Sequence, residues 1–122
     1  MPGFTNTEAR DTLDARFPTT GASDYIAWST DGEDETDILA RTAVGATGWA
    51  SATNADPAVK ANAAVLNTAP ATGGGTITHY AIFDADEAGM QRTEWTAVDT
   101  PRTLTAGDNL SAAVGALKIT LT

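Results

Sequence analysis

The sequence predicts an all-β domain: a jelly-roll-like β-sandwich of about seven or eight strands with one short N-terminal helix. Three observations support this. The segment 76–84, TITHYAIFD, has strong β propensity and contains no Gly or Pro. Further short apolar segments recur about every ten residues, separated by turn residues. A helix-start signal stands at residues 5–8. Residues 1–22 are expected to form the helix and a linker, and residues 23–122 the sandwich.

The helix is predicted from its capping residues and its spacing. Thr5-Asn6-Thr7-Glu8 has the form of a capping box, with Thr5 as the N-cap. Ala9, Leu13 and Phe17 then recur at every fourth position and form a narrow apolar stripe that ends at Pro18. This stripe can pack either on the domain's own sheet or on a neighbouring subunit.

The segment 76–84 is predicted to be the central strand. Simple alternation places Ile77, Ala81 and Phe83 on one face and Tyr80 and Ile82 on the other. Because both faces carry large apolar groups, we expect the strand to be covered on both sides. One cover would be the opposing sheet, and the second would be the N-terminal segment or a neighbouring subunit.

The other strands follow from shorter patterns. Residues 59–65 alternate, which predicts a half-buried strand with Val59 and Val65 toward the core and Lys60 toward water. In the C-terminal segment the apolar alternation changes parity near Gly115, which predicts a bend where a strand crosses a sandwich corner. A turn is expected at 99–101. The remaining expected strands are 24–30, 38–44, 91–98 and 102–105.

The composition is acidic. Sixteen acidic and seven basic side chains give a net charge of −9. Such a surface repels nucleic acid and anionic membranes, so neither is expected as a partner. It suits either a halophilic source or an ordinary acidic domain. There is no Cys for disulfides or thiolate sites, and no apolar run long enough to span a bilayer. A soluble protein made in the cytoplasm is expected.

Four motifs carry a family resemblance. They are GGGTITHYAIFDA at 73–85, TPRTL at 100–104, AGDNL at 106–110 and GALKITL at 115–121. This pattern resembles a family of small structural proteins of tailed viruses, labelled tail-fibre-like or capsid decoration proteins. Residues before 73 match only in general layout. The resemblance implies a virion β-sandwich without catalytic residues, and the acidic surface adds the expectation of a virus of a halophilic archaeon.

The resemblance implies assembly. The expected function is a capsid decoration or turret subunit that forms a homotrimer on the head of a tailed virus, with the major capsid protein or other virion proteins as partners. The alternative is a collar, tail or tail-fibre component, with host-receptor binding if Trp49 is exposed at a tip. The expected location is the virion. The expected interface residues are Leu13, Phe17, Tyr80 and Trp49, with core packing as the alternative for the tryptophan.

The sequence also contains residues typical of two other kinds of site. His79 is the only histidine and precedes Asp84 and Asp86, so a His–Asp general base is the enzymatic alternative. No GxSxG elbow, second histidine or P-loop lysine accompanies it, so neither an enzymatic activity nor a cofactor is predicted. Asp84, Asp86 and Glu87 form a candidate Ca²⁺ or Mg²⁺ site. The acidic run 31–37 lacks EF-hand spacing and is interpreted as a solvated turn.

Overall fold

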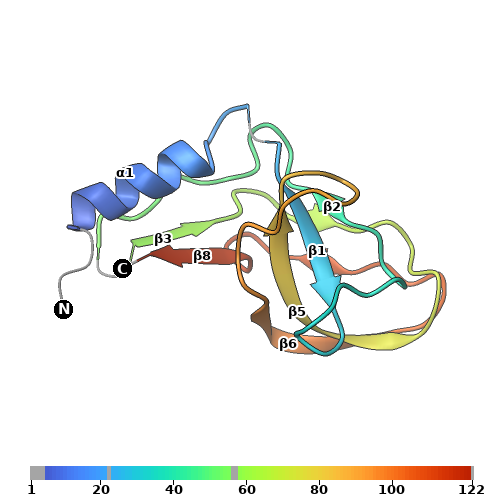
Figure 1. Cartoon of the computed structure of the whole chain (residues 1–122). Helices are drawn as coiled ribbons and strands as arrows, with labels where there is room; N and C mark the ends of the chain where they lie inside the picture. Colours follow the sequence, from blue (N-terminus) through green and yellow to red (C-terminus); the bar gives the residue numbers. More distant parts are fainter. Residues whose placement is uncertain (1–4, 22, 56–57, 122) are drawn as a thin grey trace.

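The computed structural model describes residues 5–21, 23–55 and 58–121 (Figure 1). This part of the chain is mostly β, with one short N-terminal helix, so the predicted fold class is confirmed. No helix among these residues is long and apolar enough to cross a membrane. The elements in chain order are α1 (Asn6–Arg16), β1 (Tyr25–Ser29), β2 (Thr42–Ala43), β3 (Ala58–Ala61), β4 (Leu66–Asn67), β5 (Gly75–Phe83), β6 (Thr96–Leu104), β7 (Ser111–Ala112) and β8 (Lys118–Leu121).

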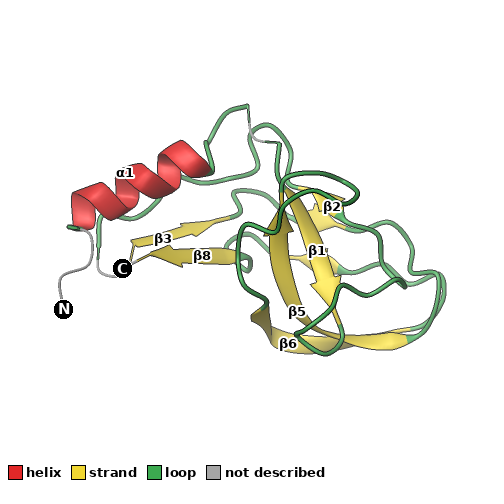
Figure 2. Ribbon diagram, viewed as in Figure 1, coloured by secondary structure: helices red, strands yellow, loops and turns green. Residues whose placement is uncertain are grey.

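The strands pair in three antiparallel groups. The largest sheet has the order β2-β1-β5-β6, while β3 pairs with β8 and β4 with β7. Figure 2 shows the β3–β8 ladder beside helix α1, with the four-stranded sheet at the other end of the molecule. β5 pairs with β1 on one side and β6 on the other, so the predicted central strand is confirmed.

Helix α1 begins as predicted and packs on its own chain. The Glu8 backbone N–H donates to Oγ1 of Thr5 at 3.2 Å, which satisfies one free amide of the first turn. The side chains of Ala9, Leu13 and Phe17 are all buried. The helix lies against β3 and β8 (Figure 1). The apolar stripe therefore packs in cis, the first of the two expected options.

The faces of β5 differ from simple alternation. Trp28 of β1 stands opposite Tyr80 in the ladder, so the two side chains share a face. Ile77 lines the same cavity as Trp28 and therefore lies on the Tyr80 face. The predicted grouping of Ile77 with Phe83 is wrong. The β5–β6 ladder is irregular between Ile77 and His79, at the point where the facing of β5 departs from alternation, and nothing in a run of strand-forming residues signals it.

Loops of the chain itself cover the opposite face of β5. Ala81 is fully buried, and the Phe83 ring lies under the guanidinium of Arg41, 3.9 Å from its central carbon. Trp95 packs against the same ring at a centroid distance of 6.2 Å. Arg41 also donates to two carbonyls of the β5–β6 loop, at 2.7 and 2.8 Å. The prediction of two covered faces is confirmed, but part of the second cover is the loop 31–41, which the sequence did not indicate, instead of the expected N-terminal segment or neighbouring subunit.

Strand β3 is turned around relative to the prediction. Lys60 is fully buried, Val59 is half-buried and Val65 is exposed, so the expected facing is wrong. The Lys60 Nζ atom lies 2.7 Å from Oδ1 of Asp14 on helix α1. A buried ammonium is tolerated where a carboxylate compensates it. Because α1 covers this face of β3 and supplies that carboxylate, the lysine points inward.

β6 runs through the predicted turn. The chain forms one nine-residue strand at the sheet edge, and its ladder with β5 shifts register between residues 97 and 102. Pro101 is tolerated there because edge strands and bulges do not need every N–H.

The corner at Gly115 is confirmed: its φ is +79°, and it stands between β7, which pairs with β4, and β8, which pairs with β3. The predicted strand 38–44 is reduced to β2.

Candidate functional site

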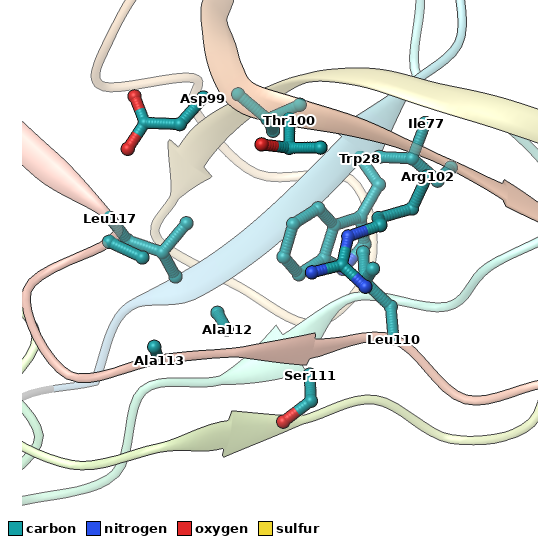
Figure 3. Close-up of a pocket in the computed structure, with 12 residues that line it drawn as sticks. Trp28, Ile77, Asp99, Thr100, Arg102, Leu110, Ser111, Ala112, Ala113 and Leu117 are labelled. Carbon is teal, nitrogen blue, oxygen red and sulfur yellow. The ribbon is translucent and has the colours of Figure 1, made fainter.

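A cavity of about 180 Å³ lies between the irregular part of β6 and the chain around β7 (Figure 3). Trp28 of β1 and Ile77 of β5 contribute to its walls. The remaining lining residues come from two segments, Val98, Asp99, Thr100 and Arg102 on the β6 side and Leu110, Ser111, Ala112, Ala113, Ala116 and Leu117 on the β7 side. Several of these are exposed, so the cavity opens to solvent.

Two local features create this space. The register shift adds residues to β6 relative to β5, and such bulges bend a strand and re-aim its side chains. Across the cavity, the chain carries the short side chains of Ala112, Ala113 and Ala116, which leave the volume unfilled. The cavity is therefore a consequence of a bulge facing a row of small residues.

Asn62 holds the β7 side of the cavity in place. Its Nδ2 donates to the carbonyls of Ala64 at 2.8 Å and Ala113 at 2.9 Å, and its Oδ1 accepts from the Leu117 N–H at 3.0 Å. The side chain is 1% exposed. The alternation of 59–65 predicted a water-facing position for Asn62, and only its three bonding partners, two of them distant in sequence, show its role.

The chemistry of the cavity favours binding over reaction. Trp28, Ile77 and two leucines form apolar parts of its wall, and β6 contributes the charged side chains of Asp99 and Arg102 (Figure 3). None of the described residues that line it is a histidine, cysteine or lysine. An apolar hollow with a few polar groups at its rim is the usual form of a binding site.

A second hollow, a groove of about 580 Å³, separates helix α1 from the β5–β6–β8 region. Leu13, Phe17 and Tyr80 line it, so the structure brings three of the four predicted interface residues together. All three are largely buried within the chain. Trp49 is 1% exposed, packs edge-on against Phe17 at 5.9 Å and donates to Oδ2 of Asp24 at 2.9 Å. A role of these residues in subunit contacts stays a prediction.

Tyr80 also closes a polar contact across this groove. Its hydroxyl accepts from the Lys118 N–H at 2.8 Å and donates to the Lys118 carbonyl at 2.9 Å. Burial raises the pKa of Tyr80 above its ordinary value. The neutral phenol therefore joins β5 to the start of β8.

The three carboxylates predicted to bind a cation are placed differently from one another. Asp84 is partly buried and accepts the Met90 N–H on Oδ1 at 2.8 Å, with Arg92 Nη2 3.8 Å from its Oδ2. Asp86 and Glu87 are exposed in the following loop. Among the residues that the structure describes, no group of three His, Asp or Glu side chains is placed to hold a metal ion. The cation site stays a prediction.

His79 and the acidic run 31–37 have structural roles. The His79 ring bonds Oγ1 of Thr78 at 2.8 Å and packs against Gly32, where an added Cβ would lie 2.9 Å from the ring. Asp31 Oδ1 accepts the Glu33 and Asp34 N–H groups, which lowers the pKa of Asp31. The carboxylates of the run are exposed, so the interpretation as a solvated turn is confirmed.

Residues 7–120 match the model of a protein family described as Podophage GP4 fiber I protein gp80. The chain belongs to this gp80 family. The matched range covers nearly the whole chain. It includes helix α1 and the first strands, which the resemblance based on the motifs at 73–121 did not cover. A search of curated proteins found no match.

Membership in the gp80 family establishes the general class of the protein. It is a structural protein of a tailed virus, of the tail-fibre type, and its location is the virion. A family of structural fibre proteins also suggests a non-enzymatic role.

Proposed function

We propose that this chain is a building subunit of a virus tail fibre, which contacts copies of itself and other virion proteins. The observation that carries the proposal is the match to a podophage fibre family over residues 7–120. The fold supports it, because the cavity between β6 and β7 has apolar wall residues of the kind found in contact sites.

The position on the particle is part of the proposal. The resemblance at 73–121 implies a capsid decoration or turret subunit on the head, whereas the family match favours a tail-fibre component. We infer the fibre position and retain a homotrimer as the expected stoichiometry. The acidic surface adds the inference of a halophilic host, with the net charge of −9 as its support.

The test is a reconstruction of the source particles, with this protein located by an antibody or a fused label. Label confined to the tail fibres is the expected result. Label repeated over the shell would overturn the fibre position in favour of decoration. Absence from purified particles would overturn a virion role for this chain. Light scattering of the isolated chain tests the trimer separately.

A further inference from the structure

Three large hydrophobic side chains stand exposed among the described residues: Val65 at 51%, Met90 at 60% and Val114 at 60%. Two of them lie beside the cavity. Because the Asn62 amide nitrogen bonds the carbonyls of both Ala64 and Ala113, the residues that follow these carbonyls, Val65 and Val114, are held close together. Ala113 itself lines the cavity. Both valines therefore lie close to the β7 side of the cavity, and we name the cavity together with Val65 and Val114 the apolar patch.

Met90 lies elsewhere on the molecule. Its carbonyl accepts the Asp84 N–H at 3.2 Å, just beyond the end of β5, in the loop that follows the β5 arrowhead in Figure 1. The cavity contains Ile77, near the start of β5. The strand between Ile77 and Phe83 spans about 20 Å. A chain therefore cannot place Met90 in its own cavity, whereas a second copy can.

We propose that Met90 of one copy inserts into the cavity of the next, in a head-to-tail contact between copies of this chain. This inference rests on the proposed function, in which copies contact one another. A contact between two different surfaces of the same molecule generates a ring if the rotation closes and a filament if it does not. Methionine suits such a contact, because its unbranched side chain adapts to irregular apolar cavities.

Charge complementarity supports the same contact. Arg102 is exposed at the cavity mouth and takes part in none of the ion pairs found among the described residues. The loop that carries Met90 exposes Asp86 and Glu87. Asp99 also lines the cavity, on the same strand as Arg102, and its carboxylate would disfavour approach of an acidic loop on that side (Figure 3). Few cations are available for such pairing in a chain with a net charge of −9.

The size and rim of the cavity favour a side chain over a small soluble ligand. Pockets for small molecules usually enclose about 300–1,000 Å³, and this cavity encloses about 180 Å³. A small polar ligand would also leave Val65 and Val114 exposed to water. A second copy would cover both valines while it fills the cavity, which is the behaviour expected of an exposed apolar patch.

Disulfide cross-linking tests this contact directly, because the chain contains no cysteine. Met90→Cys and Ala113→Cys variants would be purified separately, mixed in equal amounts and oxidised. The matched control replaces Met90→Cys with Thr7→Cys, an exposed position on helix α1. We expect a mixed disulfide dimer in the first mixture well above the control. Equal yields in the two mixtures would overturn the proposal.

Self-association of Met90 variants tests the same contact without the geometric requirements of a disulfide. Met90→Asp should weaken association of the isolated chain by roughly 10- to 100-fold, the loss expected when one methionine is no longer buried, while Met90→Leu should retain it. Unchanged self-association in Met90→Asp would overturn the proposal. Both experiments use the isolated chain, so their outcome does not depend on where the protein lies on the particle. If the protein is found in the fibre but the Met90 contact is absent, the Met90 proposal is rejected and the proposed function is kept.

Discussion

At the residue scale, the ion pair between Lys60 and Asp14 is the clearest departure from the sequence pattern. Lys60 sits in a regular alternation whose apolar members are Val59 and Val65, and periodicity alone turns it outward. Its partner is 46 residues away, on a helix. Local pattern carries no information about such a distant counter-charge, and this is why the facing of β3 could not be predicted.

The pair makes stability depend on acidity. Burial of the Asp14 carboxyl would raise its pKa, but hydrogen bonds from the Lys60 ammonium and the Ala52 N–H outweigh this effect, so the pKa of Asp14 lies below 3.8. A depressed pKa contributes stability above the unfolded-state value, and that contribution is lost as pH falls through the folded value. We expect the stability difference between wild type and Asp14→Asn to shrink on acidification below 3.8.

At neutral pH, Asp14→Asn should cost about 1–2 kcal/mol, measured by urea unfolding. This loss of unfolding free energy is smaller than that expected for a fully buried ion pair, because the Asp14 side chain is 36% exposed and water screens it. Asparagine retains an oxygen acceptor, so the change isolates the charge. Asp11→Asn, at a carboxylate that is 58% exposed, is the control and should change stability by less than about 0.5 kcal/mol. Equal losses in the two variants would contradict the prediction.

Tyr80 gives a second prediction at this scale. Tyr80→Phe keeps the ring but leaves the N–H and carbonyl of Lys118 without their partner, which should cost about 1–3 kcal/mol in thermal or urea unfolding. Tyr25→Phe, at a partly exposed position of β1, is the matched control and should be nearly neutral. A neutral Tyr80→Phe would show that water replaces the hydroxyl.

At the element scale, the cavity depends on Asn62 more than on the strands beside it. Asn62→Ala leaves the Ala64 carbonyl and the buried Leu117 N–H without their partner, whereas the Ala113 carbonyl keeps its bond from the Ala116 N–H; the loss should be about 2 kcal/mol. The Leu117 amide should also exchange its hydrogen faster, measured by hydrogen exchange. Asn67→Ala, on the exposed side of β4, is the control. Unchanged exchange at Leu117 would show that the turn holds its shape without the amide.

The same scale shows what the sequence could and could not predict. The N-cap at Thr5, the central strand and the corner at Gly115 follow from local residue types, and all are confirmed. The irregularity after Ile77 and the continuation of β6 through Pro101 are not local properties. They depend on the register between two strands about twenty residues apart. The cavity arises from that register, so its lining could not be read from the chain alone.

At the scale of the whole molecule, assembly takes place between acidic bodies. Copies with a net charge of −9 repel one another, and the range of that repulsion depends on salt. The screening length is about 10 Å at 0.1 M salt and about 3 Å at 1 M. Burial of Met90 and the two exposed valines is not weakened by screening. Salt does weaken the pairing of Arg102 with the acidic loop, but that is one local attraction against the repulsion between two bodies that each carry a net charge of −9.

We therefore expect the mass of the assembled protein, measured by light scattering, to rise between millimolar and molar NaCl. A variant with Glu33→Gln and Asp34→Asn separates charge from other effects of salt. Both side chains are exposed in the turn at 31–37, where only their backbone N–H groups bond Asp31. With two negative charges removed, the variant should associate more tightly than wild type at low salt and equally at high salt. An oligomer mass that does not change with salt would contradict both the repulsion and the inferred halophilic adaptation.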